Sequence, residues 1–185
     1  MSRLLGFPDR YAQFVARQRV RVGFLLVAAF AWLARPSILS MELGLPIAVA
    51  GLLLRAWAAG HLEKNTRLAT TGPYGWVRNP LYLGTVLTAC GLVTAARRPL
   101  LAVLFALVFT LVYLPAIQLE ENYLAELFPD FSEYAARVSA FLPRWPAVRN
   151  PARFRGNLYF RNEEYQALLG FLAGAAWLAV KLIWM

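Results

Sequence analysis

Long apolar runs separated by short polar segments dominate this chain. Five runs are long enough, or nearly so, to cross about 30 Å of hydrocarbon, which takes roughly 20 largely apolar residues in a helix. They are Val22 to about Leu39, about Leu43 to Gly60, Leu81–Ala96, Pro99–Leu119 and Tyr165–Met185. The pattern predicts an all-α fold, a polytopic membrane helical bundle with about five transmembrane helices. Because 21 residues precede the first run, we expect an uncleaved span rather than a signal peptide.

Two polar regions, His61–Asn79 and Glu120–Glu164, each follow an even-numbered span, so they are expected on the same side of the membrane as the N-terminus. The second begins with apolar residues at helical spacing, which predicts short amphipathic helices at the membrane surface. Pro129 is expected to end the first of them. No repeat or linker divides the chain. We therefore predict a single domain over 1–185, with an interfacial segment at 144–164 and a last span at 165–185.

Composition and charge agree with this arrangement. Hydrophobic residues make up 59% of the chain and charged residues 16%, which excludes a conventional soluble enzyme. With five spans in this order, fourteen basic residues lie on the same side of the membrane as the N-terminus and four lie on the opposite side. Because basic residues are more frequent in cytoplasmic loops, this count places the N-terminus in the cytoplasm. The net charge of +9 beside five apolar runs indicates an anionic membrane surface, and no nucleic acid partner is expected.

One cysteine and one histidine limit the chemistry. Cys90 alone cannot form an intramolecular disulfide, and His61 alone does not provide the usual zinc ligands, so no metal site is predicted. Any chemistry must use another cofactor or none.

A turn-forming segment precedes the third span. Residues 70–75, Thr-Thr-Gly-Pro-Tyr-Gly, are typical of a tight loop, and Asn79 followed by Pro80 is expected to supply the N-cap and first residue of a helix. Such a helix start faces the cytoplasm and attracts a carboxylate or phosphate. An ordinary helix cap within an interfacial aromatic belt explains the same residues without a ligand.

Charged residues lie near the ends of two spans. Glu120 and Glu121 follow the fourth apolar run, and an inward-facing Glu120 would need a cationic partner, although a solvated interfacial pair is the alternative. Arg55 lies within the second run, where its side chain either reaches the cytoplasmic surface or pairs with Glu120 or Glu121.

Together these segments resemble the isoprenylcysteine carboxyl methyltransferase and phospholipid methyltransferase family of integral membrane enzymes. The resemblance lies in residues 71–84, Thr-Gly-Pro-Tyr-Gly-Trp-Val-Arg-Asn-Pro-Leu-Tyr-Leu-Gly, followed by Glu120-Glu121 and Leu142-Pro143 in the same order and spacing. It covers a core of about 55–143. The resemblance implies a multi-span helical enzyme that binds S-adenosylmethionine on the cytoplasmic side, releases S-adenosylhomocysteine, and covers the pocket with its C-terminal segment.

The family's cofactor contacts are carried over position by position. They imply that the following residues bind the cofactor: Thr66, Arg67, Leu68, Ala69, Tyr74, Asn79, Pro80, Leu81, Tyr82 and Glu120.

Two positions depart from the family pattern. Asn79 stands where the family usually has histidine, and it forms hydrogen bonds but does not titrate near neutral pH. Ala116 stands where the isoprenylcysteine enzymes carry a substrate-binding arginine, so prenylcysteine is not predicted as the acceptor. A lipid or another small lipophilic molecule remains. An amine or thiol acceptor would need a base, for which His61, Glu121 and Tyr123 are unranked candidates.

Other functions remain open at this stage. Membrane reductases that use NADPH resemble this family in architecture, and a non-catalytic lipid-binding protein of the same fold would bind no cofactor at all. Arginines and aromatic residues alternate over 144–164, which suits anionic headgroups; this segment either closes over the pocket or anchors the last helix.

Overall fold

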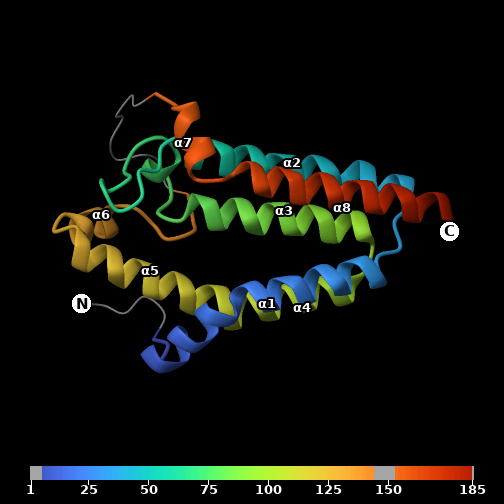
Figure 1. Ribbon diagram of the computed structural model, residues 1–185, viewed down its shortest axis with the longest axis horizontal. Coiled ribbons are helices and arrows are strands. Elements are labelled where there is room, and N and C mark those ends of the chain that lie inside the picture. Colours follow the sequence, from blue (N-terminus) through green and yellow to red (C-terminus); the bar gives the residue numbers. More distant parts are fainter. Residues whose placement is uncertain (1–5, 144–152, 185) are drawn as a thin grey trace.

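The computed structural model describes residues 6–143 and 153–184, and these are helical with no strands. The long helices run side by side along one axis (Figure 1). The elements are α1 (Asp9–Leu33), α2 (Ile38–Ala59), the short 3-10 turn η1 (Gly72–Gly75), α3 (Pro80–Ala96), α4 (Pro99–Val108), the π-helical η2 (Phe109–Tyr113), α5 (Leu114–Leu127), α6 (Phe131–Arg137), α7 (Gly156–Arg161) and α8 (Tyr165–Trp184).

The membrane bundle predicted from the apolar runs is confirmed in kind. Three helices in the described part of the chain are long and apolar enough to cross a membrane: α2, the continuous helix Pro99–Leu127, and α8. The α3 helix is apolar but has only 17 residues.

The predicted first span is wrong in its boundaries. The α1 helix ends at Leu33, because Pro36 favours an extended residue before it and cannot continue the helix. Ser37 then caps α2 through a reciprocal pair of hydrogen bonds with Ser40, so Leu39 belongs to the second helix. The first half of α1 is polar, so the helix is less apolar than a full span.

The bundle has two layers, with α2, α3 and α8 in one and α1, α4 and α5 in the other (Figure 1). Within the first layer, α2 and α3 approach so closely that side chains are excluded at several positions. A Cβ atom on Gly91 would lie 2.3 Å from the backbone nitrogen of Ala48, and one on Gly44 would lie 2.4 Å from the carbonyl oxygen of Gly91. Small residues at the contact therefore set the distance between the two helices.

The helix from Pro99 to Leu127 carries the paired glutamates beyond the apolar layer. At 1.5 Å per residue, Glu120 lies about 32 Å along the axis from Pro99, which exceeds the hydrocarbon thickness. Pro115 has no N–H for the carbonyl of Leu111 four residues earlier, and the Tyr11 hydroxyl donates to that carbonyl at 2.7 Å. The α1 helix thus supports α5 where its own backbone bonding is interrupted.

Polar contacts fix both ends of α8. Near its C-terminus the Lys181 ammonium donates to the carbonyls of Trp32 and Ala34, at 2.8 and 2.9 Å, at the end of α1. Just before its N-terminus, Glu164 pairs with Arg55 of α2. These bonds hold one end of α8 against the end of α1 and the other end against α2, and they set where the preceding α7 lies.

Candidate functional site

The motif-bearing segments gather at one end of the bundle. In Figure 1 the loop after α2, the start of α3, the end of α5, and the short helices α6 and α7 lie together at the end opposite the C-terminus. The sequence prediction that the two polar regions share one side is confirmed by this arrangement.

The Gly-Pro-Tyr turn is built against His61. Gly72 has a φ of +59°, and a Cβ atom there would lie 2.7 Å from the His61 ring, so glycine is required both by conformation and by space. His61 Nδ1 lies 2.9 Å from the carbonyl oxygen of Trp57, and because a carbonyl only accepts, Nδ1 carries a proton. His61 is therefore held from two sides, as a wall of the turn.

Tyr74, in this turn, has a buried hydroxyl that lacks a hydrogen-bond partner in the described structure. Its side chain is only 7% exposed, while its backbone carbonyl accepts the Tyr134 hydroxyl at 2.8 Å. Burial raises the pKa of the Tyr74 phenol far above its usual value, and the negative charges of Glu120 and Glu164 raise it further while Arg55 opposes them. The hydroxyl is thus a neutral donor, close to three charged groups and short of one partner.

Arg78, Asn79 and Glu121 form a buried network at the start of α3. The Arg78 guanidinium donates to both Glu121 oxygens at 3.2 and 3.3 Å and to two backbone carbonyls, of Ala135 and Val138, at 2.6 and 2.8 Å. Asn79 Nδ2 donates to the same carboxylate at 2.9 Å. The network ties the start of α3 to α5 and α6.

Asn79 is the N-cap residue by position, as predicted, but its side chain makes no capping bond. The amide is turned toward Glu121 instead, because that buried carboxylate needs donors. The contribution of the Asn79 side chain is therefore to hold the backbone at the start of α3 against Glu121.

Glu120, the neighbour of Glu121, faces a different way. Its carboxylate is exposed and accepts the Tyr82 hydroxyl at 2.9 Å. Tyr82 stands one turn into α3 behind Pro80 and Leu81, so the predicted cofactor residues of α3 and α5 meet at this pair. Tyr123, one turn after Glu120, is 48% exposed.

Arg55 pairs with neither of the two glutamates considered from the sequence. Its Nε and Nη2 atoms donate to the Glu164 carboxylate at 2.5 and 3.1 Å, and Nη1 donates to the Leu81 carbonyl at 3.3 Å and to the Thr85 hydroxyl. The reason is position: Glu164 lies directly before α8, beside the C-terminal half of α2. One guanidinium thus joins α2, α3 and the start of α8.

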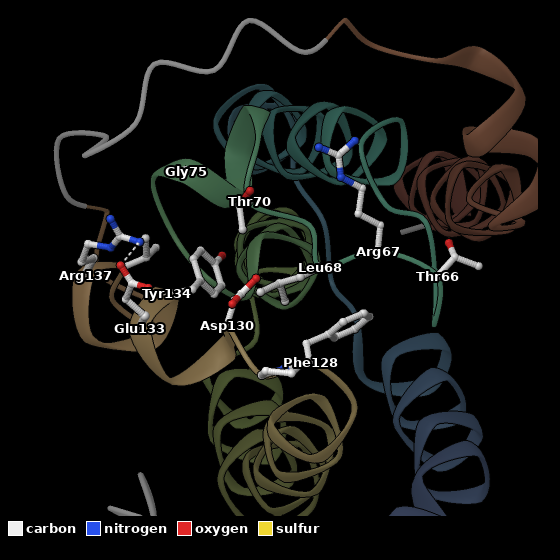
Figure 2. Close-up of a pocket in the computed structure, with 12 residues that line it drawn as sticks. Thr66, Arg67, Leu68, Thr70, Gly75, Phe128, Asp130, Glu133, Tyr134 and Arg137 are labelled. Atoms are coloured by element: carbon white, nitrogen blue, oxygen red, sulfur yellow. Dashed lines mark ion pairs between the residues drawn. The ribbon is translucent and has the colours of Figure 1, made fainter.

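Two cavities adjoin the loop before the turn. The larger, of about 630 Å³, lies between residues 66–75 and the α5–α6 corner, and its lining includes Thr66, Arg67 and Leu68. Figure 2 shows Leu68 and Phe128 facing one another across it, with the Arg67 guanidinium turned away from Asp130. The smaller, of about 200 Å³, lies on the other side of the loop, and its lining includes Arg67, Leu68 and Ala69.

The ten predicted cofactor residues therefore fall into three groups at the same end of the bundle. Tyr74, Tyr82 and Glu120 lie on the bundle side of the loop; the four residues 66–69 form the wall between the two cavities; and Asn79, Pro80 and Leu81 form the start of α3. No single cavity among those described contains all of them.

Sequence reasoning assigned no role to three polar groups of this end: Arg78, Tyr134 and Glu164. Arg78 lies within the stretch 71–84, but each of the three acts through a partner 43 to 109 residues away in the chain, so no local pattern reveals its role. The unpartnered buried hydroxyl of Tyr74 likewise has no signature in sequence.

The described half of the C-terminal segment, residues 153–164, packs over the end of α2. The backbone N–H of Arg155 donates to the Gly60 carbonyl at 3.0 Å, and Asn162 donates to the carbonyls of Ala59 and Leu62. A Cβ atom on Gly60 would lie 2.2 Å from the Phe154 ring. Residues 144–152 of the predicted interfacial segment lie outside the described residues.

Comparison with known proteins matches residues 19–130 to the phospholipid methyltransferase family model. Similar curated proteins include the nickel-cobalt-cadmium resistance protein NccN of Alcaligenes xylosoxydans xylosoxydans, 33% identical over 81% of this chain and 76% of the relative. The cobalt-zinc-cadmium resistance protein CzcN of Cupriavidus metallidurans is 38% identical over 58% of this chain and 49% of its own length. The protein-S-isoprenylcysteine O-methyltransferase of Saccharomyces cerevisiae is 35% identical over 44% and 34%.

No solved structure matches this chain. Among residues 6–143 and 153–184, no three His, Cys, Asp or Glu side chains gather as they would to hold a metal ion. The family match covers more than half of the chain and includes residues 71–84 and the pair Glu120-Glu121. The chain belongs to the phospholipid methyltransferase family.

Proposed function

We propose that this protein transfers a methyl group from S-adenosylmethionine to a lipid-like acceptor at the cytoplasmic face of the membrane. The observation that carries the proposal is the Tyr74 hydroxyl, a buried donor without a partner in the described structure, in a turn that lies within the residues matched to the family. A buried hydroxyl left unbonded costs about 1–3 kcal/mol, so a ligand atom at this place would be favoured.

The groups around Tyr74 fit the polar parts of this cofactor. The Tyr82–Glu120 pair presents an exposed carboxylate to a ligand ammonium or to ribose hydroxyls. The first turn of α3, whose N-cap side chain is turned elsewhere, presents a positive helix end to a carboxylate. Aromatic faces at Tyr74 and Tyr82 suit a sulfonium or an adenine ring.

When bound, S-adenosylmethionine supplies a methyl group on a positively charged sulfur. The chain's own residues then need to position the acceptor in line with that methyl group and to exclude water. Arg55 and Glu164 hold the start of α8, and the 153–164 segment covers the end of α2, so both help to close this end of the bundle. Glu121 is held by Arg78 and Asn79, which favours a supporting role over that of a base.

The acceptor class is proposed from the surroundings. Ala116 is buried and carries no charge at the position where isoprenylcysteine enzymes have arginine, so an acceptor carboxylate has no partner there. The apolar outer faces of α2 and α8 would admit a lipophilic acceptor from the bilayer. A phospholipid or another small lipophilic molecule is therefore proposed over a prenylated protein.

Calorimetric titration of the detergent-purified protein with S-adenosylhomocysteine tests the proposal. We expect saturable binding that is weakened about tenfold by Tyr74→Phe and also by Glu120→Ala, each of which removes one polar contact. Glu126→Ala is the matched control, because Glu126 is exposed on the same helix, less than two turns from Glu120.

The rival functions predict other outcomes. Binding of NADPH with no response to S-adenosylhomocysteine would favour a reductase. Binding of neither compound would favour a lipid-binding protein of the same fold. Equal effects of Glu120→Ala and Glu126→Ala would remove Glu120 from the proposed site.

A further inference from the structure

The lining of the smaller cavity, of about 200 Å³, carries mainly positive charge. Its lining includes three arginines, Arg67, Arg153 and Arg155, against a single carboxylate, Glu63. Arg67 comes from the loop after α2, whereas Arg153 and Arg155 come from the segment that precedes α7. The two walls are 86 residues apart in sequence at their nearest arginines, Arg67 and Arg153.

The one carboxylate of the lining, that of Glu63, already forms an ion pair. Glu63 is bonded to Arg155, and this bond holds the pKa of the Glu63 carboxyl below its usual value, with Arg67 and Arg161 contributing. Arg67 and Arg153 form no ion pair with any described residue. Figure 2 shows the Arg67 guanidinium turned away from the acidic side chain of Asp130 in the larger cavity. Arg67 and Arg153 therefore bring two exposed positive charges, neither in an ion pair with a described residue, to the lining of a small space.

The volume of the cavity limits the size of the ligand that it can hold. Sites for drug-sized molecules and cofactors usually occupy about 300–1,000 Å³. A cavity of about 200 Å³ suits a small anion, and the hydroxyls of Thr70 and Thr71 in its lining add donors to those of the arginines. Arginine forks and hydroxyl donors in this combination match the oxygens of a phosphate group.

The position of the cavity favours a lipid as the source. It begins directly after Ala59, where the apolar α2 helix ends, so it lies at the level of the membrane surface. Trp57 and Phe154, whose rings contact the lining residue His61, expose large aromatic surfaces beside it, as residues at a membrane interface do. A phospholipid with its chains in the bilayer would present its headgroup at this height.

We propose that this cavity binds a phosphate group, held between Arg67 and Arg153 and provided by the headgroup of a membrane phospholipid. Binding would join the loop after α2 to the segment before α7 and so hold that segment over the end of the bundle. The lining of this cavity shares Arg67, Leu68 and Ala69 with the residues that the family resemblance assigns to the cofactor, but it includes none of Tyr74, Tyr82 and Glu120. Binding of a phosphate group between Arg67 and Arg153 does not require methyl transfer.

The test uses the full chain in a neutral detergent, titrated with short-chain phosphatidylglycerol and, separately, with inorganic phosphate. We expect saturable binding of phosphatidylglycerol that the double variant Arg67→Gln/Arg153→Gln weakens at least tenfold. The control is Arg10→Gln/Arg17→Gln, which removes the same charge from exposed positions on α1 and should change the affinity less than twofold. Far-ultraviolet circular dichroism checks that each variant is folded, and the single variants replace the double one if it is not.

Each outcome decides the question. Binding of inorganic phosphate with the same dependence on Arg67 and Arg153, and no gain from the lipid, would keep the phosphate site and assign it to a free anion. Equal losses in the two double variants would show diffuse attraction to a basic surface and overturn the proposal, as would lipid binding unchanged by Arg67→Gln/Arg153→Gln. Because no arm contains the methyl donor, failure here is distinguishable from failure of the proposed activity.

Discussion

Glu120 and Glu121 are adjacent in sequence, yet the structure predicts opposite consequences for their loss. The Glu121 side chain is 7% exposed and that of its partner Arg78 is 5% exposed. Removing one member of a buried, hydrogen-bonded ion pair leaves the other charge uncompensated, which costs about 3–5 kcal/mol. We therefore expect Glu121→Gln to lower the free energy of unfolding by about that amount.

Glu120 offers the comparison. Its carboxylate is exposed and has one hydroxyl donor, Tyr82, so Glu120→Gln should change stability by less than about 1 kcal/mol. For a chain of this size, 1 kcal/mol corresponds to about 2–4 °C in Tm. Glu121→Gln is thus expected to lower Tm by about 6–20 °C, and Glu120→Gln by no more than about 4 °C.

Heat unfolding in detergent, followed by circular dichroism, measures the difference, with S-adenosylhomocysteine binding recorded on the same preparations. Glu120→Gln should lose affinity and keep stability, whereas Glu121→Gln should lose stability. If Glu121→Gln unfolds at the wild-type temperature but abolishes turnover, the structural reading of Arg78, Asn79 and Glu121 is wrong and Glu121 becomes the base.

Three further perturbations test the packing around the site. Gly91→Ala should destabilise the protein by about 1–3 kcal/mol because its Cβ would lie against the α2 backbone, whereas Gly170→Ala, with open space around it, should not; thermal unfolding compares them. Tyr11→Phe should cost about 0.5–1.5 kcal/mol in the same assay, since it removes the donor to the Leu111 carbonyl. Burial raises the pKa of Tyr134 above its usual value near 10, so its contribution to stability is complete below about pH 10 and is lost as the pH rises further. Tyr134→Phe should therefore make the loss of stability in alkaline titration less steep, and an unchanged slope would argue against this origin.

The sequence by itself determined the class of fold and the helix boundaries that lie at or near a proline of the third and fourth apolar runs. Apolar runs of near-membrane length require helices, because backbone groups in hydrocarbon must bond within their own segment. Strong local signals such as Pro80, Pro99 and Pro129 placed helix starts and a stop within a residue or two. Where the local signal was weak, around Arg35 and Pro36, the predicted span continued past the true helix end.

The motif residues could also be assigned to one end of the bundle, because the order of spans decides which loops share a side. Their roles could not be assigned in this way. Nothing local distinguishes Glu120 from Glu121; helix rotation turns one toward Tyr82 and the other toward Arg78.

Only the tertiary structure decided which charges meet. Arg55 was predicted either to reach the cytoplasmic surface or to pair with Glu120 or Glu121, but its partner is Glu164, 109 residues away, which the packing of α8 brings beside α2. Tertiary packing also buries the Tyr74 hydroxyl and brings Arg67 and Arg153 into the lining of one cavity. Helix formation depends on neighbours in sequence, whereas desolvation and ion pairing depend on distances that exist only once the helices have packed.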